Sequence, residues 1–142
     1  MKWTRPAHIE EINRRCRGTL CDHLGIEFIE VGEEHMSAKM GVDERTNQPM
    51  GVLHGGATAA LAETVASAAA NYRVEEGKVC VGLELNINHI RSVRSGFVTA
   101  VARPLHVGKM TQVWEIKITN ERQELVSAAR LTLAVIDQKY PK

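Results

Sequence analysis

The sequence predicts an α+β fold in which one antiparallel β-sheet wraps around one long central helix. Residues 54–73 consist mainly of strong helix formers, eight of them alanine, and their side chains are small and apolar almost all round. A helix of this kind is buried rather than laid on a surface. Strand-like segments lie on both sides of it, and strands joined by short turns pair antiparallel because a parallel crossover needs a dozen or more residues.

The segments before the central helix are short. Residues 9–17 are expected to form a polar helix, and residues 24–31 and 36–42 to form two strands separated by a Gly-Glu-Glu turn. Residues 43–52 are rich in polar side chains and include a proline and a glycine, which predicts a loop.

Four strands are expected after the central helix. Residues 79–88 have the clearest signal, with an aliphatic side chain at every second position. Three further strands are expected at 97–103, 112–119 and 125–135, with turn residues between them. No internal repeat or linker divides the chain, and 142 residues is the size of a single domain, so one domain over residues 1–142 is expected.

Composition and charge exclude several classes of function. The net charge is +1, so no overall field attracts the chain to nucleic acid or to a membrane surface. The three cysteines are an odd count at no metal-ligand spacing, which favours a reducing, cytoplasmic environment and predicts neither a disulfide framework nor a metal site. No signal-peptide pattern is visible, and the apolar stretch 57–70 is too short to span a membrane.

Glu63 is the acidic residue of the central helix. Its neighbours one helical turn away are Ala59, Ala60, Ala66 and Ser67. An ionised carboxylate buried among alanines is costly, and such surroundings suit a catalytic acid or base near neutral pH. A carboxylate that faces a solvated groove or pairs with an arginine from a strand would explain the same pattern, so both interpretations stay open.

The start of the central helix, His54-Gly55-Gly56, is a candidate oxyanion site. A helix N-terminus presents N–H groups without intrahelical acceptors, and glycine lets a ligand oxygen approach them closely. Such amides could stabilise the negative charge that develops on a carbonyl oxygen during acyl transfer. The alternative interpretation is that the two glycines only allow tight packing of the helix start.

The spacing between Gly55 and Glu63 predicts a site shared between subunits. Eight residues of helix separate them by about 12 Å along the axis, so one ester or thioester carbonyl cannot easily contact both within one chain. If both act on one substrate, the chain forms a dimer with two equivalent sites about a two-fold axis.

Two basic segments, 89–94 and 104–109, follow expected strands. Their arginine, lysine and backbone N–H groups could bind phosphates, and solvated strand ends are the alternative. Neither segment is a Walker loop or a GxGxxG motif, and the chain contains no G-x-S-x-G elbow and no HExxH zinc motif.

Taken together, Gln48, the run His54-Gly55-Gly56 and Glu63 resemble the motif of the hotdog-fold acyl-CoA thioesterases. The resemblance spans nearly the whole chain. The sequence is similar in particular to the branch of this family that acts on aromatic acyl thioesters. That branch includes enzymes of menaquinone synthesis and of proofreading in enterobactin synthesis. The resemblance implies hydrolysis of an acyl-CoA, with a hydroxybenzoyl- or hydroxynaphthoyl-type acyl group, to the free acid and CoA. It implies no cofactor and no metal.

The resemblance also implies roles for individual residues. Glu63 would be the catalytic carboxylate, as nucleophile or as general base on water, and the Gly55 amide of the other subunit would polarise the thioester carbonyl. Gln48 and His54 would flank the carbonyl or the attacking water. Two hydroxyl side chains would orient the water or the carboxylate: Thr64 and Ser67.

The resemblance further implies a CoA site and an assembly. The nucleotide and pantetheine arm would be held by Gly82, by the turn His89, Ile90, Arg91 and Ser92, and by the stretch His106, Val107, Gly108, Lys109, Met110 and Thr111. The sheets of two subunits would join edge to edge in a homodimer, and two dimers would pair as a tetramer.

Several alternatives stay open at this stage. The substrate could be an acyl or aryl carrier protein, hydrolysed in a proofreading reaction, or the chain could bind acyl-CoA without turnover. A dehydratase on the same fold is disfavoured because His54 is followed by two glycines. A transcriptional sensor is disfavoured because about 22 residues before the first strand leave little room for a helix-turn-helix.

Overall fold

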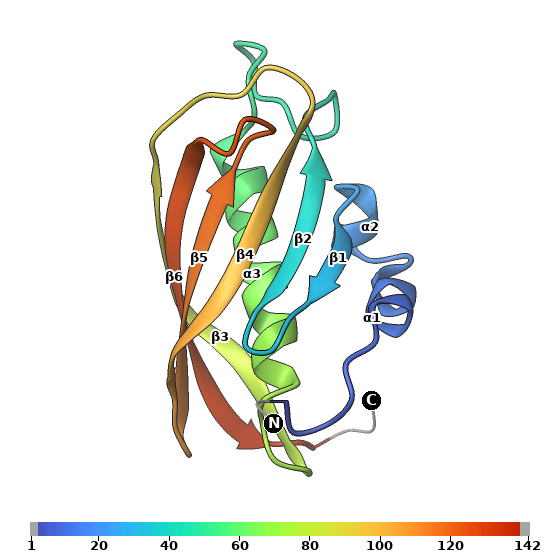
Figure 1. Ribbon diagram of the computed structural model, residues 1–142, viewed down its shortest axis with the longest axis vertical. Helices are drawn as coiled ribbons and strands as arrows, with labels where there is room; N and C mark the ends of the chain where they lie inside the picture. The colour runs from blue at the N-terminus through green and yellow to red at the C-terminus, as the bar shows by residue number, and fades with distance from the viewer. Residues whose placement is uncertain (1–2, 140–142) are drawn as a thin grey trace.

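The computed structural model describes residues 3–139 (Figure 1). The elements of this part of the chain, in order, are α1 (Ile9–Cys16), α2 (Leu20–His23), β1 (Glu27–Val31), β2 (Met36–Gly41), α3 (Gly55–Asn71), β3 (Lys78–His89), β4 (Phe97–Val107), β5 (Thr111–Thr119) and β6 (Leu125–Asp137). Every element predicted from the sequence is present, and α2 is an addition. None of the helices within residues 3–139 is long and apolar enough to cross a membrane.

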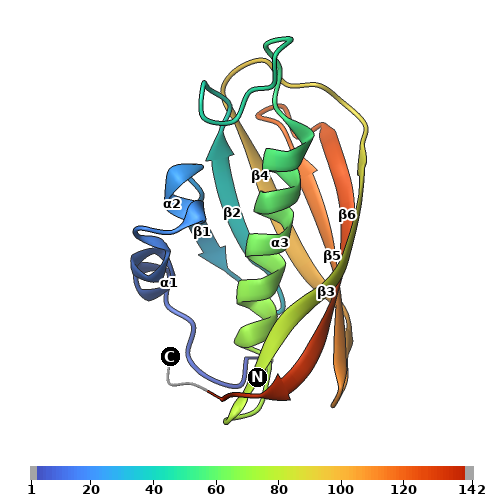
Figure 2. The same ribbon diagram turned by 180° about the vertical axis from the view of Figure 1, so that it is seen from behind.

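The strands form one six-stranded sheet in the order β1-β2-β4-β5-β6-β3, and every pairing is antiparallel. Figures 1 and 2 show this sheet curving around α3, which confirms the predicted fold class. Strand β3 pairs with β6 and forms one edge of the sheet. Residues 90–96 therefore carry the chain from this edge across the end of the sheet to β4 in its middle.

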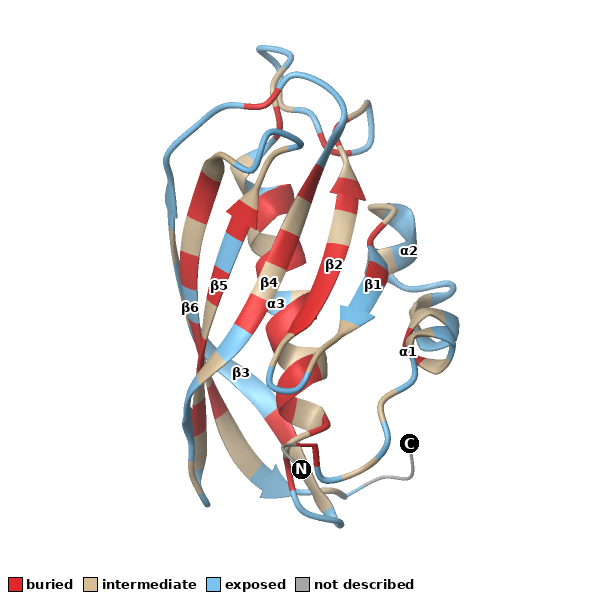
Figure 3. Cartoon of the chain, viewed as in Figure 1, coloured by how far each residue is buried: buried red, intermediate tan, exposed pale blue. Residues whose placement is uncertain are grey.

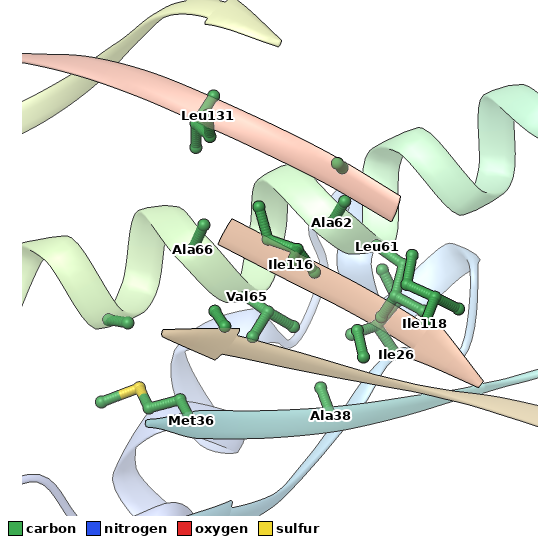
Figure 4. Packing of buried hydrophobic residues seen from close by; sticks show 14 of the residues in the cluster. Ile26, Met36, Ala38, Leu61, Ala62, Val65, Ala66, Ile116, Ile118 and Leu131 are labelled. Atoms are coloured by element: carbon green, nitrogen blue, oxygen red, sulfur yellow. The ribbon is translucent and has the colours of Figure 1, made fainter. Parts of the chain in front are cut away.

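The core lies between α3 and the inner face of the sheet. Figure 4 shows Ala62, Val65 and Ala66 of α3 among side chains of the strands, including Ile116 of β5 and Leu131 of β6. All five side chains are completely buried. The small alanine side chains let the backbone of the helix approach the sheet closely, which explains why a curved sheet can close around a single helix.

One stripe of α3 is not part of this core. The buried positions of the helix recur at helical spacing: Ala57, Thr58, Leu61, Ala62, Val65, Ala66, Ala69 and Ala70. The remaining stripe contains Gly56, Ala59, Ala60, Glu63 and Ser67, which are exposed or half-buried. The expectation of a helix buried on all sides is therefore wrong for this stripe.

Edge strand β3 does not keep the simple alternation that its sequence predicts. The pairing with β6 shifts between Gly82 and Glu84, which marks a β-bulge. Before the bulge Cys80 is buried while Val81 is exposed, and Leu83 is 63% exposed. Figure 3 shows much of this strand as exposed surface. The strand thus presents aliphatic side chains at a free sheet edge.

Strand β4 is longer than predicted, because it continues through Pro104 to Val107. Its pairing with β2 ends at Ala102, so beyond that point one edge of β4 has no neighbouring strand within residues 3–139. Proline is tolerated at such an edge, and the pairing with β5 shifts directly after Pro104. His106 and Val107 therefore belong to the strand end rather than to the turn.

The N-terminal segment is fastened across one end of α3. Trp3 is buried, stacks on Trp114 at 6.5 Å between ring centroids, and donates from Nε1 to the Gly32 carbonyl at 2.8 Å. Helix α1 is held to β1 by two hydrogen bonds between the Asn13 side chain and the Phe28 backbone. These contacts place α1 and α2 beside α3, where they form a wall of the cavity described next.

Candidate active site

Glu63 lies on the open stripe of α3, and its carboxylate approaches Gly82 of β3. A Cβ atom built on Gly82 would overlap Glu63 Oε2, so glycine is what allows the carboxylate to lie against this strand. Glu63 is exposed in the single chain. The expectation that it is buried among alanines is therefore wrong for one chain alone, because its neighbouring alanines belong to the stripe that the sheet leaves uncovered.

Glu63 lines a cavity of about 620 Å³, which we call the Glu63 cavity. It is lined by residues of α1, α2, α3, β1 and β3, and these include three of the predicted catalytic residues, Glu63, Thr64 and Ser67. The other lining residues are Arg5, Ile12, Arg15, Cys16, Thr19, Cys21, Phe28, Ala68, Asn71, Tyr72, Val79 and Cys80.

One cysteine of the Glu63 cavity, Cys16, is a poor competitor of Glu63 as a nucleophile. Burial and the neighbouring Cys21 thiol raise the pKa of Cys16 to about 11, so this thiol stays protonated near neutral pH. Cys21 Sγ lies 3.8 Å from Thr64 Oγ1. Within residues 3–139, no group of three or more His, Cys, Asp or Glu side chains is arranged to hold a metal ion.

At the start of α3, the N–H groups of Gly55 and Gly56 differ in whether they have a hydrogen-bond acceptor. His54 is the N-cap, and its Nδ1 accepts a hydrogen bond from the Gly56 N–H at 2.7 Å. The Gly55 N–H has no acceptor among residues 3–139. Because a helix N-terminus carries partial positive charge, this amide is the one available to a carbonyl oxygen.

A second, smaller cavity of about 270 Å³ surrounds this amide, and we call it the Gly55 cavity. The His89 ring lies against Gly55, since a Cβ there would be 2.7 Å from His89 Nε2, and His89 Nδ1 is 3.0 Å from Ser127 Oγ. Gln48 also lines the cavity, and its side-chain oxygen accepts a hydrogen bond from the Met50 N–H. Its remaining lining residues are Leu53, Thr58, Ile90, Arg91, Ser92 and Val126.

The Glu63 cavity and the Gly55 cavity share no lining residue. One chain therefore keeps the carboxylate apart from the free amide, as the spacing of Gly55 and Glu63 on one helix predicts. Acyl transfer needs both a base or nucleophile and a donor to the oxyanion, and each cavity supplies one of these two groups. The first offers a base or nucleophile beside an apolar space, and the second offers a hydrogen-bond donor for a developing oxyanion.

The predicted CoA-binding residues also lie in separate parts of the structure. His89 to Ser92 line the Gly55 cavity, whereas Val107, Gly108 and Lys109 line a third cavity of about 610 Å³, together with Arg73 and Lys78. His106 and Met110 are exposed beside that third cavity, and the Gly108 N–H donates to the Thr111 carbonyl at 2.9 Å to close the turn.

The structure gives two residues, Asn71 and Arg5, a place at the site that sequence patterns did not indicate, although Asn71 ends the range 66–71 that the family resemblance places at the acyl pocket. Asn71 donates to the carbonyls of Ser67 and Cys80 and accepts from the Cys80 N–H, so it ties β3 to the end of α3. This connection holds Gly82 beside Glu63. Arg5 lines the far part of the Glu63 cavity. No motif or spacing marks either residue, because each acts through a segment distant in the chain.

Replacing Gly82 with alanine is expected to lower kcat about 10-fold or more with little change in Tm. The new Cβ would push the Glu63 carboxylate from its place, and small misplacements of reacting groups cost large factors in rate. Steady-state kinetics and thermal unfolding measure both effects. In a Glu63→Asp background the shorter side chain avoids the overlap, so Gly82→Ala should have little further effect. Full activity of Gly82→Ala alone would contradict this geometry.

Comparisons with known proteins agree with the fold. Residues 50–127, more than half of the chain, match the thioesterase superfamily. The crystal structure of a thioesterase from Haemophilus influenzae is 48% identical, with a TM-score of 0.96 over 99% of this chain and 98% of that chain.

Several relatives carry names that state a reaction. The 1,4-dihydroxy-2-naphthoyl-CoA hydrolase of Escherichia coli is 43% identical over 136 residues, 96% of this chain and 100% of its own length. The proofreading thioesterase EntH of Cronobacter turicensis is 44% identical over 136 residues, 96% of this chain and 99% of its own length. The chain therefore belongs to the thioesterase superfamily, has its hotdog fold, and is a thioester hydrolase.

Proposed function

We propose that the protein hydrolyses aromatic acyl-CoA thioesters to the free acid and CoA, with Glu63 as the catalytic carboxylate. The observation that carries this proposal is a carboxylate residue, Glu63, lining a large, mainly apolar cavity that the aromatic residues Phe28 and Tyr72 also line. A flat acyl group fits such a space, and the substrate named for the relative from E. coli is of this kind.

The residues support a hydrolysis in which one water is consumed. The thioester carbonyl is polarised by the free Gly55 N–H, and Glu63 either attacks the carbonyl carbon or removes a proton from the attacking water. The C–S bond breaks, and CoA takes up a proton and leaves as the thiol. If water attacks, the acid is released directly. If Glu63 attacks, it forms an anhydride with the acyl group, and water hydrolyses this anhydride to release the acid and regenerate the carboxylate. Thr64 and Ser67 lie beside Glu63 and orient the water or the carboxylate, while Gln48 and His54 flank the carbonyl.

The complete site requires two chains, and the free edge of β3 suggests how they meet. Gly55 lies against His89 near one end of β3, and Glu63 lies against Gly82 further along the strand. If two β3 strands pair antiparallel about a centre midway between residues 82 and 89, position 89 of one chain faces position 82 of the other. Gly55 of one subunit then lies beside Glu63 of its partner.

The same pairing would cover the exposed aliphatic side chains of the edge strand, Val81 and Leu83. An unpaired edge of this kind is a template for association, which is consistent with a homodimer. In this arrangement the basic segments that include Arg91 and Lys109 hold the CoA phosphates. A further pairing of dimers into a tetramer stays a prediction.

The test is release of free thiol from a panel of CoA thioesters. The panel contains benzoyl, hydroxybenzoyl, hydroxynaphthoyl, phenylacetyl, short-chain and long-chain acyl groups. We expect kcat/KM for the aryl members to exceed that for the aliphatic members by about 10-fold or more, because flat rings bury their area at little cost in conformational entropy.

A preference for aliphatic chains would contradict the aromatic assignment and leave the reaction class intact. If the protein hydrolyses an arylated carrier protein but no acyl-CoA, the substrate is the carrier-bound acyl group, as in proofreading, and the proposed acyl-CoA substrate is wrong. Tight binding of acyl-CoA without thiol release from any substrate would contradict the proposed reaction itself.

A further inference from the structure

Two arginines without an acidic partner line the Glu63 cavity. Arg5 comes from the N-terminal segment and Arg15 from α1. Within residues 3–139, no carboxylate lies within ion-pair distance of either guanidinium. Glu63 is the one acidic residue among the described residues that line this cavity, and the proposed function assigns it to the reaction. The cavity therefore carries an excess of positive charge away from Glu63.

Arg5 is held in a defined position. Its Nη2 donates to the Asn71 carbonyl at 3.2 Å, and its guanidinium lies 4.5 Å from the centroid of the Tyr72 ring. Both contacts are at the C-terminal end of α3, where the helix dipole favours a cation. They use one of the five N–H donors of the guanidinium. Arg5 Nε is buried and has no acceptor among the residues that the structure describes.

The distance between Glu63 and Arg5 suits the length of an acyl group. Asn71 follows Glu63 by eight residues, which is about 12 Å along α3. The wall between them consists largely of small or apolar side chains, including Ala68, Tyr72 and Val79. An acyl group whose carbonyl lies at Glu63 and whose body follows α3 toward its C-terminal end meets Arg5 with its far end.

We propose that the preferred acyl group bears a carboxylate at its far end, and that Arg5 is the specificity-determining residue that binds it. The inference rests on the proposed function and adds a chemical feature of the substrate. The planar guanidinium suits a carboxylate, which can accept two hydrogen bonds from it. Since Arg5 is already held by Asn71 and Tyr72, little conformational entropy is lost on binding. Arg15 is exposed and adds long-range attraction at the same end of the cavity.

A purely structural role for Arg5 makes a different prediction, and Arg73 provides the matched control. The Arg73 guanidinium also lies near an aromatic ring, at 5.8 Å from Trp3, and its Nη1 is also buried without an acceptor in the described part of the chain. It lines the third cavity and not the Glu63 cavity. If bracing the fold is all that Arg5 does, both arginines should affect stability and neither should affect the choice of acyl group.

The experiment compares 6-carboxy-2-naphthoyl-CoA with 2-naphthoyl-CoA by thiol release. We expect the wild type to favour the carboxylated substrate about 10-fold or more in kcat/KM, as expected for hydrogen bonds between charged groups. Arg5→Gln should abolish this preference, Arg5→Lys should retain part of it, and Arg15→Gln should reduce it slightly. Arg73→Gln should keep it. Both kcat/KM values are measured on the same preparation, so a loss of folded protein lowers both equally and leaves their ratio unchanged.

The remaining outcomes distinguish failure of this inference from failure of the proposed function. Equal hydrolysis of both substrates by the wild type, or a preference that survives Arg5→Gln, would overturn this inference and leave the proposed function standing. Equal loss of the preference in Arg5→Gln and Arg73→Gln would overturn it as well. If the wild type hydrolyses neither of these two substrates and no acyl-CoA of the panel, the proposed function and this inference are overturned together.

Discussion

Glu63→Gln is expected to lower kcat for thioester hydrolysis by about 10³-fold while the protein stays folded. The substitution keeps the shape of the side chain and removes the group that attacks the carbonyl or accepts the proton from water, and general acid–base catalysis contributes factors of this order. Because Glu63 is exposed in the single chain and makes no ion pair within residues 3–139, the free energy of unfolding should change by no more than about 0.5 kcal/mol.

The measurement is kcat on the best substrate of the panel, with thermal unfolding on the same preparation. Glu115→Gln is the control, since Glu115 is a half-buried carboxylate on β5 that pairs with Lys117 and lines none of the three cavities. Its kcat should equal that of the wild type. Hydrolysis by Glu63→Gln at the wild-type rate would show that another group performs the reaction.

A mixture of two inactive variants is expected to recover activity. In Glu63→Gln the carboxylate is lost. In Gly55→Ala a Cβ would lie 2.7 Å from His89 Nε2 and would disturb the oxyanion site. If each site takes Glu63 from one subunit and Gly55 from its partner, a mixed dimer has one site with both residues intact. Random pairing at equal amounts should therefore restore about one quarter of the wild-type activity.

The two variants are co-expressed with different affinity tags, so that mixed dimers can be isolated and assayed separately. Isolated mixed dimers should reach about half of the wild-type activity, since one of their two sites is intact. Each variant paired with itself is the control and should stay inactive. Mixed dimers as inactive as the parents would show that Glu63 and Gly55 act within one chain or on different steps.

The fold class and the two candidate catalytic positions could be predicted from the sequence by itself. The alanine-rich run of α3 and the strand patterns are local signals, because helix propensity and side-chain periodicity depend on neighbours within a few residues. Gly55 and Glu63 lie on that same helix, so their separation follows from helix geometry. The motif made by Gln48, His54 and these two residues then indicated the family that the comparisons confirm.

Only the tertiary structure decided where the strands lie in the sheet and what surrounds the site. The position of β3 at an edge, the exposure of Val81 and the open stripe around Glu63 all depend on which segments cover one another, and no short-range pattern encodes that. Arg5 is the clearest case, since its hydrogen bond to Asn71 joins residues that are 66 positions apart. Contacts of this length are formed by the folded core as a whole, and they set the chemistry at the far end of the cavity.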